Sequence, residues 1–239
     1  MNKTTQLKKL LLQRKALPCP GVYDALSARM VEYCGFQACQ ISGFGVSASS
    51  LGMTDASFTS LEEIVRITSN IVRAVDIPVM TDADTGYGNA VNVWWTTKRL
   101  EETGAAGMNL EDQCFPKRCG HMAGKQLISL GEMVGKIRAA VDAKRDPDFV
   151  INARTDAAYV CGIEEAIRRG NAYLEAGADM VFVESPASAE EVKRAIEQIK
   201  GPVSINMLEG GRTPMLTFEE LRQLGAARVS CPMFTSLIA

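Results

Sequence analysis

SLEEIVRITSNIVRAVDIPVMTDAD, residues 60–84, joins an amphipathic helix to a short buried strand. Apolar or small side chains recur every three or four residues from Leu61 to Val75, which is typical of a helix that buries one face. Ser60 and Glu63 have the spacing of a capping box, in which each side chain bonds an amide at the helix start. The run at residues 78–83 does not alternate, as expected for a strand that helices cover. The stretch therefore predicts an α/β unit.

This unit recurs along the chain. Capping-box pairs also stand at Ser129/Glu132, Ser188/Glu191 and Thr217/Glu220, and glycines at 35, 104, 177 and 225 mark helix ends. The apolar runs that we predict to be strands are residues 17–22, 37–42, 78–83, 106–111, 149–154, 180–185, 202–207 and 228–233.

Eight strands with short links predict the fold class α/β, a (β/α)8 TIM barrel, whose usual length of about 250 residues is close to the 239 found here. An open doubly wound sheet is the alternative, but no GxGxxG follows the first strand. We expect one domain over residues 1–239. Because the sequence ends at Ala239, soon after the eighth run, we expect the eighth helix to be missing or truncated.

Composition restricts the class of protein. The chain is 46% hydrophobic and 23% charged, and its net charge of −2 gives no excess positive field for nucleic acid. No apolar run approaches the ~18 residues of a membrane helix, and residues 1–13 lack the apolar core of a signal peptide. Seven cysteines without a CxxC pair indicate reduced thiols. We therefore expect a cytoplasmic protein with neither a nucleic-acid nor a membrane partner.

Acidic side chains follow two neighbouring strands. Asp82 and Asp84 end the third run, two residues apart, which would place both on the same side of an extended strand. Glu111 ends the fourth run. Active sites of such barrels lie at the carboxyl ends of the strands, and clustered oxygen ligands suit magnesium, with manganese as the alternative. Capping of the following helices or pairing with arginines is the structural alternative.

Arg154 ends the fifth run, where its guanidinium offers a rigid fork for a carboxylate or a phosphate. An internal ion pair with Glu111 or Glu184 is the structural alternative, and the two roles are compatible. Polar groups also end the sixth and seventh runs, at Glu184 and Asn206. The second run ends at Ser42 and Gly43, where glycine lets backbone amides approach a ligand oxygen.

A long polar loop follows the fourth strand. Residues 113–127 exceed the length of a simple connection and are typical of a lid. Cys119 stands among Lys117, Arg118, His121 and Lys125, and such cations favour a thiolate. The spacing of Cys114, Cys119 and His121 does not fit a zinc site. No GxSxG elbow accompanies the single histidine, which argues against a serine hydrolase, and no predicted strand ends in a lysine that could form a Schiff base.

These residues together resemble the isocitrate lyase/phosphoenolpyruvate mutase superfamily, in its lyase branch. The signature Lys117–His121, with the sequence KRCGH, carries the resemblance, and the other segments follow the order of the family over nearly the whole chain. The other matching segments are residues 20–25, 42–45, 51–55, 82–88, 111–113, 153–156, 184–186 and 206–207.

The resemblance implies a magnesium-dependent barrel with a defined site. Asp82, Asp84 and Glu111 would hold the metal, directly or through water. Cys119 would be the acid on the lid. Arg154, Lys117 and His121 would complete the catalytic set. The implied substrate-binding residues are Ser42, Gly43, Phe44, Asp55, Glu184, Asn206 and Pro232.

The resemblance also implies a reaction, the cleavage of a 2-hydroxy dicarboxylate similar to 2,3-dimethylmalate into pyruvate and a carboxylic acid. Cys119 favours carbon–carbon cleavage over phosphonate chemistry, because the phosphonate-processing members lack this cysteine. Met122 stands where methylisocitrate lyases tend to carry an arginine, and Pro232 where oxaloacetate hydrolases share a serine. The alternatives are 2-methylisocitrate lyase, a phosphonopyruvate or carboxyphosphonoenolpyruvate mutase-type enzyme, and oxaloacetate decarboxylase or hydrolase. Relatives of this kind exchange the last helix, so we expect a homotetramer if that helix is present.

Overall fold

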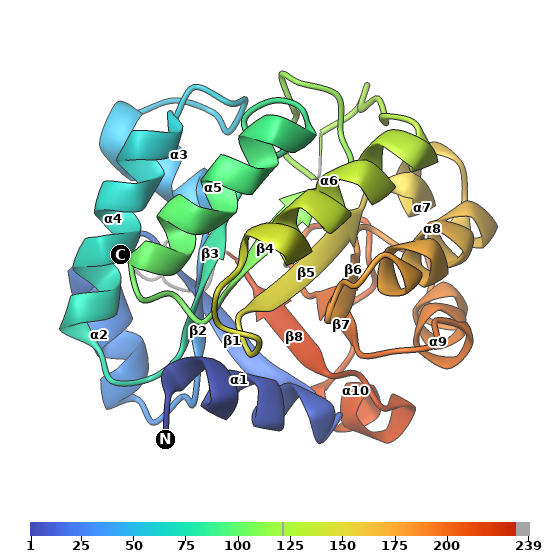
Figure 1. Cartoon of the computed structure of the whole chain (residues 1–239). Coiled ribbons are helices and arrows are strands. Elements are labelled where there is room, and N and C mark those ends of the chain that lie inside the picture. The colour runs from blue at the N-terminus through green and yellow to red at the C-terminus, as the bar shows by residue number, and fades with distance from the viewer. Residues whose placement is uncertain (121, 233–239) are drawn as a thin grey trace.

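Eight of the apolar runs form parallel strands in this computed structural model, which describes residues 1–120 and 122–232. Each strand pairs with the next, and β8 pairs with β1, so that the sheet closes into a barrel (Figure 1). The predicted (β/α)8 fold class is therefore confirmed. The strands are β1 (Leu17–Val22), β2 (Cys39–Ile41), β3 (Val79–Asp82), β4 (Gly107–Glu111), β5 (Val150–Thr155), β6 (Met180–Val183), β7 (Val203–Asn206) and β8 (Arg228–Cys231).

Helices surround the barrel (Figure 1). Their apolar faces pack on the outward side chains of the strands and form the hydrophobic core with them. They are α1 (Lys3–Leu12), α2 (Ala25–Tyr33), α3 (Gly43–Leu51), α4 (Leu61–Ala74), α5 (Ala90–Glu102), α6 (Leu130–Ala143), α7 (Ala157–Val160), α8 (Ile163–Glu175), α9 (Ala189–Gln198) and α10 (Phe218–Leu224). Residues 233–239, on which the expectation for an eighth helix falls, lie outside the described residues.

The capping boxes form only in part. Ser60 and Thr217 make the full reciprocal box with the glutamate three residues later. Ser129 and Ser188 only accept the amide at that position, so the prediction of a full box is wrong there. At α9 the reason is a competing donor, because the Glu191 carboxylate accepts from the amide of Ala187 at 2.6 Å instead.

The amino-terminal helix closes one end of the barrel. Leu7 and Leu11 of α1 are buried with Leu17, Met80 and Val150 at the amino ends of the strands. In Figure 1, α1 lies across the lower end of the barrel. The opposite end, where the strands finish, is therefore the end left for a site.

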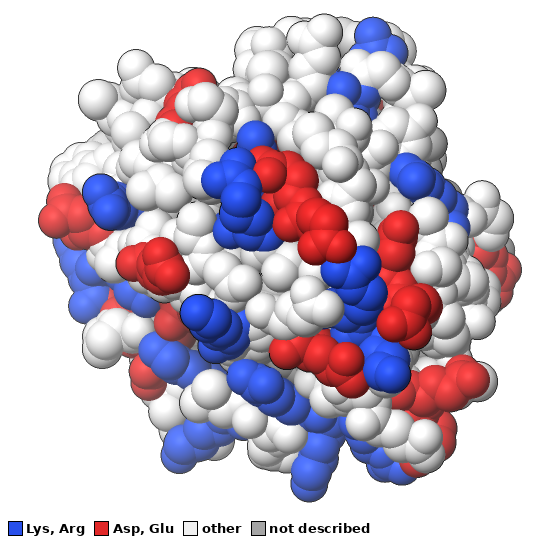
Figure 2. Space-filling model, turned by 90° about the vertical axis from the view of Figure 1, so that its right-hand side faces the viewer, with Lys and Arg blue, Asp and Glu red and all other residues white. Residues whose placement is uncertain are grey.

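The outer surface carries charges of both signs. Over α8 and α9, Lys and Arg side chains alternate with Asp and Glu (Figure 2). Ion pairs between Arg168 and Glu165, at 2.7 Å, and between Arg194 and Glu164 account for part of this pattern. No helix among the described residues is both long enough and apolar enough to cross a bilayer.

Candidate active site

A cavity of about 270 Å³ opens at the carboxyl ends of the strands. Every predicted site residue lines it except Asp84, which lies just behind the wall, and His121, which is outside the described residues. The lining residues are Gln40, Ile41, Ser42, Gly43, Phe44, Asp55, Asp82, Asn109, Glu111, Lys117, Cys119, Gly120, Arg154, Phe182, Glu184, Asn206, Leu208, Glu209, Ser230 and Pro232.

One side of the cavity is acidic. We call Asp55, Asp82, Asp84 and Glu111 the carboxylate cluster. The expectation that Asp82 and Asp84 continue one extended strand is wrong, because β3 ends at Asp82 and Asp84 has a φ of 52°. This turn brings the Asp84 amide onto the Asp82 carboxylate at 3.0 Å. The Asp84 side chain consequently points to Ser57 and Lys117 rather than into the open cavity.

Gly43 leaves room for the Asp82 carboxylate, because it has no side chain. A Cβ atom at Gly43 would come within 2.3 Å of Asp82 Oδ2 and 3.4 Å of Asp55 Oδ2. Glycine is therefore the residue that lets these two carboxylates lie against the start of α3. Ser42 caps that helix by accepting the amide of Gly45 at 3.1 Å, so the amides of Gly43 and Phe44 begin the first turn.

Lys117 is the cation inside the carboxylate cluster. Its Nζ lies 2.7 Å from Asp55 Oδ2 and 3.7 Å from Asp84 Oδ1, and its side chain is buried. Burial acts to lower the pKa of this ammonium group, but the surrounding carboxylates, Asp84 and Glu111 foremost, raise it well above its ordinary value. Lys117 is thus held fully charged.

Lys117, together with Arg154 at Glu111, does not balance four carboxylates. Among the described residues, Asp84 Oδ1 and Glu111 Oε1 are buried without a hydrogen-bond donor. Burial raises the pKa of Asp84 to about 6 and that of Glu111 well above its ordinary value. Uncompensated buried carboxylate oxygens of this kind fit a divalent cation such as Mg²⁺.

The described carboxylates nevertheless do not form a direct three-ligand metal site. Within residues 1–120 and 122–232, no group of three or more His, Cys, Asp or Glu side chains is placed to hold a metal directly. Mg²⁺ usually keeps several waters and takes only one or two protein carboxylates, so the cluster suits a hydrated ion.

The opposite side of the cavity is a closed network. We call Arg154, Asp156, Glu184 and Asn206 the arginine cluster. Arg154 contacts Asp156 at 2.9 Å, Glu111 at 3.3 Å and Glu184 at 3.5 Å. Asn206 Nδ2 donates to Glu184 at 3.3 Å. The guanidinium is therefore held by three carboxylates. Both roles weighed for Arg154 remain compatible, because it forms internal ion pairs and still lines the cavity.

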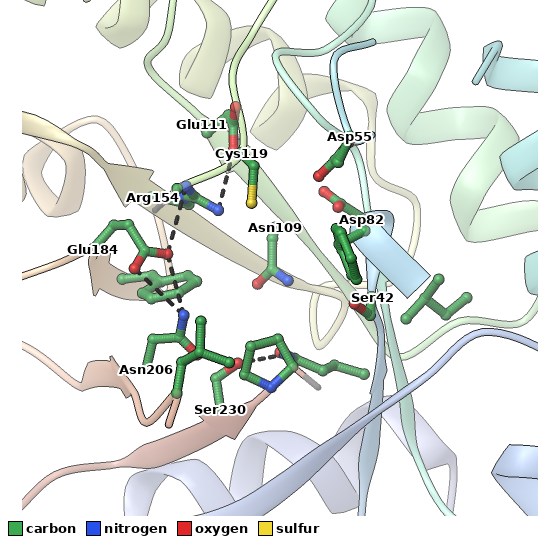
Figure 3. A pocket seen from close by; sticks show the side chains of 18 of the residues that line it. Ser42, Asp55, Asp82, Asn109, Glu111, Cys119, Arg154, Glu184, Asn206 and Ser230 are labelled. Carbon is green, nitrogen blue, oxygen red and sulfur yellow. Dashed lines mark hydrogen bonds and ion pairs between the residues drawn. The ribbon is translucent and has the colours of Figure 1, made fainter. Parts of the chain in front are cut away.

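Cys119 lies between the two clusters. Figure 3 shows its sulfur atom pointing into the cavity, with Arg154 on one side and Asp82 on the other. The cations near it in sequence have other partners: Lys117 binds Asp55, and Lys125 binds Asp156 at 2.7 Å. The thiol is therefore placed by the loop, while the charges around it belong to two separate networks.

Sequence reasoning missed part of the cavity floor. Gln40, Asn109, Phe182 and Ser230 line the cavity, and Gln40 Nε2 donates to Ser230 Oγ. Each stands two residues before a predicted site residue on its strand, and alternate residues of a strand share a face. Counting back by two would have found all four, from Ser42, Glu111, Glu184 and Pro232.

The sequence is similar to a known family of enzymes. A family model described as phosphoenolpyruvate phosphomutase matches residues 7–239. A "2,3-dimethylmalate lyase" of Eubacterium barkeri is 49% identical over 94% of this chain and 78% of its own length. The chain belongs to the phosphoenolpyruvate phosphomutase family. This chain is also similar to a "2-methylisocitrate lyase" of Aeropyrum pernix, with 44% identity over 96% of this chain and 73% of that protein's length.

Solved structures of the phosphomutase family superpose closely on this barrel. A 2,3-dimethylmalate lyase, titled as a member of the PEP mutase/isocitrate lyase superfamily, gives a TM-score of 0.94 at 36% identity, over 99% of this chain and 80% of that one. An oxaloacetate acetylhydrolase with 3,3-difluorooxalacetate gives 0.95 at 36% identity, over 99% and 82%. A phosphonopyruvate hydrolase with oxalate and Mg²⁺ gives 0.86 at 33% identity, over 96% and 80%. The predicted superfamily and the prediction of a lyase-type enzyme are confirmed.

Proposed function

We propose that the chain is a magnesium-dependent carbon–carbon lyase that cleaves a 2-hydroxy dicarboxylate of the 2,3-dimethylmalate class into pyruvate and a carboxylic acid. One observation carries the proposal. The Cys119 thiol faces a cavity that has an under-compensated carboxylate cluster on one side and Arg154 on the other. A cation site, an anion site and a proton donor therefore surround one small volume.

The cavity suits a small, doubly charged substrate. Its volume of about 270 Å³ lies just below the ~300 Å³ at which ligand pockets usually begin. The first amides of α3, at Gly43 and Phe44, supply a helix amino terminus for one carboxylate. Arg154 supplies charge for the other. When bound, Mg²⁺ would be held through water by Asp82, Asp84 and Glu111, and its charge would favour loss of a proton from a bound hydroxyl.

Three movements of protons and electrons make up the cleavage. A residue of the carboxylate cluster takes the proton of the C2 hydroxyl, and the O–H electrons form the C=O bond of pyruvate. The C2–C3 bond breaks, and its electron pair passes into the departing carboxylate as an enediolate, which Arg154 and the backbone amides stabilise. Cys119 then gives its proton to C3, which leaves a neutral C–H bond and a thiolate.

Charge separates this substrate from a tricarboxylate. Of the described lining residues, Lys117 and Arg154 are the cations, and both already face several carboxylates. Met122 is 42% exposed and brings no charge. A third substrate carboxylate would find no cation of its own, which favours dimethylmalate over 2-methylisocitrate.

A panel of substrates tests the proposal. The chain, supplied with MgCl₂, is offered 2,3-dimethylmalate, 2-methylisocitrate, phosphonopyruvate and oxaloacetate. Pyruvate release is followed with lactate dehydrogenase for the first three, with pyruvate kinase and ADP added for phosphonopyruvate, because its rearrangement would give phosphoenolpyruvate. Oxaloacetate is followed through oxalate and carbon dioxide. We expect the highest kcat/KM for the substituted malate. A higher value for any of the other three would replace the proposal by the corresponding alternative.

Removal of the thiol tests the mechanism. Cys119→Ala should lower kcat by about 10²–10⁴-fold, the usual contribution of a general acid, while substrate binding persists. Cys34→Ala is the matched control, because Cys34 is an exposed thiol beyond α2. Full activity of the Cys119→Ala enzyme would remove this residue from the reaction.

A further inference from the structure

A buried lysine lies behind the catalytic loop. The side chain of Lys125 is fully buried, and its Nζ donates to the Gly120 carbonyl oxygen at 2.6 Å and to Asp156 Oδ1 at 2.7 Å. The ring of Tyr159 covers it, with Nζ 4.4 Å from the ring centroid. Lysine is seldom buried in this way unless each of its contacts is needed, because desolvation of the ammonium group is costly.

The carboxylate partner connects this lysine to the cavity. Asp156 is also fully buried, and its two oxygens accept from Arg154 Nε at 2.9 Å and Arg154 Nη2 at 3.1 Å. One carboxylate is therefore shared between Lys125, which binds the loop, and Arg154, which lines the cavity. The loop and the guanidinium cannot shift independently while both bonds persist.

Gly120 lies against Arg154 itself. A Cβ atom at Gly120 would come within 2.6 Å of Arg154 Nη2 and 2.9 Å of Glu184 Cδ. The Gly120 carbonyl oxygen is also within 3.3 Å of Ser185 Oγ. Lys125 thus fixes the carbonyl oxygen of Gly120, the residue that directly follows Cys119, and the Ser185 hydroxyl is shared between this oxygen and Glu184 Oε1 at 3.1 Å.

We propose that Lys125 is a positioning residue, which anchors the Gly120 peptide to Asp156 and so holds the Cys119 thiol over Arg154. This role rests on the proposed function of Cys119 as the proton donor. Lys125 does not line the cavity, so it acts through Gly120 and Asp156 rather than on the substrate. The structural alternative is an ion pair that only stabilises the fold.

Lys144 provides the matched control. It is a largely buried lysine that also binds one carboxylate, Asp179 at 3.1 Å, and backbone carbonyls, those of Phe149 at 3.0 Å and Pro147 at 3.3 Å. It lies just before β5, at the amino ends of the strands and away from the cavity. Lys125→Met and Lys144→Met therefore remove the same kind of contact at opposite ends of the barrel.

Steady-state kinetics give the first readout, with 2,3-dimethylmalate and MgCl₂. We expect Lys125→Met to lower kcat by about 100-fold, the usual effect of a displacement near 1 Å, and to change KM by less than about threefold. Lys125→Arg, which keeps the charge and the donors, should recover part of kcat. Lys144→Met should leave kcat unchanged. An unchanged kcat in Lys125→Met, or a rise in KM alone, would overturn the proposal.

Thiol alkylation gives a second readout that needs no turnover. Iodoacetamide modification is followed by peptide mass spectrometry at Cys119, with the exposed Cys34 as the internal reference. We expect the rate at Cys119, relative to Cys34, to change severalfold in Lys125→Met and to stay constant in Lys144→Met. If wild-type enzyme fails to cleave dimethylmalate, the proposed function fails, but this readout still tests Lys125. An unaltered ratio would assign Lys125 to stability alone.

A milder variant keeps the test decisive if Lys125→Met does not fold. Ser185→Ala removes the hydroxyl that lies 3.3 Å from the Gly120 carbonyl oxygen and 3.1 Å from Glu184 Oε1, without removing a charge. We expect it to lower kcat about fivefold, the equivalent of one hydrogen bond. A Ser185→Ala enzyme with both wild-type kcat and wild-type Cys119 reactivity would contradict a positioning role for this anchor.

Discussion

The two sides of the cavity differ in how their charges are matched. In the arginine cluster, Arg154 faces three carboxylates, and Asn206 donates to one of them. Burial acts to raise the pKa of Asp156, but Arg154 and Lys125 hold it below its ordinary value. In the carboxylate cluster the pKa of Asp84 is instead raised to about 6, chiefly by burial.

The difference shows what each side requires. The arginine cluster is complete, so it can present a fixed cation to a substrate without rearranging. The carboxylate cluster is incomplete: among the described residues Lys117 contacts Asp55 and Asp84, Arg154 contacts Glu111, and two buried carboxylate oxygens still lack hydrogen-bond donors. It requires a further positive charge, which a hydrated divalent ion would bring. Disruption of each side should therefore have a different signature.

The largest effect is expected on the arginine side. Arg154→Lys should lower kcat by about 10²–10³-fold, because a single ammonium group cannot contact three carboxylates and a substrate with the geometry of a guanidinium fork. Steady-state kinetics at saturating MgCl₂ measure the change. Arg99→Lys is the control, since Arg99 also pairs with two carboxylates, Glu62 and Glu102, but on the surface. Equal kcat in the two variants would show that the arginine cluster is only structural.

An intermediate effect is expected on the acidic side. Gly43→Ala places a Cβ atom 2.3 Å from Asp82 Oδ2, so the carboxylate must move. After removal of metal with EDTA, the MgCl₂ concentration for half-maximal activity should rise about tenfold, as when groups that orient metal ligands are altered. Gly131→Ala is the control, because nothing lies within 4 Å of a Cβ there. Activity that ignores EDTA altogether would remove the metal from the proposal.

The last effect concerns stability rather than activity. The pKa of Asp84 is about 6 in the folded chain and about 4 in an unfolded one, so the folded state binds the proton more tightly. The resulting stabilisation is present below pH 4 and is lost as the pH rises to 6, by at most about 3 kcal/mol. Asp84→Asn should lack this loss, and asparagine tolerates the left-handed backbone at this position.

Urea unfolding between pH 4 and 7 measures the effect as the difference between wild type and Asp84→Asn. MgCl₂ should reduce the pH-dependent loss in wild type, because a cation favours the ionised carboxylate. Parallel curves for the two chains, with and without MgCl₂, would show that Asp84 does not carry the excess charge of the carboxylate cluster.

Most of the fold could be predicted from the sequence because burial leaves a local pattern. Each apolar run overlaps one strand of the barrel: the run at residues 17–22 coincides with β1, and only β5 extends past its run, by one residue to Thr155. The helix α1 was missed, since only Leu7 and Leu11 of its buried face are large and apolar, and their role as a plug depends on the closed barrel. The half-formed box at α9 could not be predicted from its spacing, because it depends on a competing donor, the amide of Ala187.

The site could be predicted where its residues end strands, and less well where it depends on contacts across the barrel. Asp82, Glu111 and Arg154 each end a run, and the barrel brings them together. The turn at Asp84 depends on a left-handed backbone, which an aspartate adopts only occasionally and which its residue type alone therefore does not predict. Lys125 stands near Cys119 in sequence, yet its partner Asp156 directly follows β5, 31 residues further along the chain. No local sequence pattern could therefore identify this ion pair.

The position of α1 has a practical consequence. The helix seals the barrel at the end opposite the cavity, and Met1 is 79% exposed. An affinity tag or a surface linker attached at residue 1 would therefore leave from the rear of the molecule. If the enzyme is immobilised through that residue, the open end of its cavity would face the solution, so that the binding of small acids could be measured.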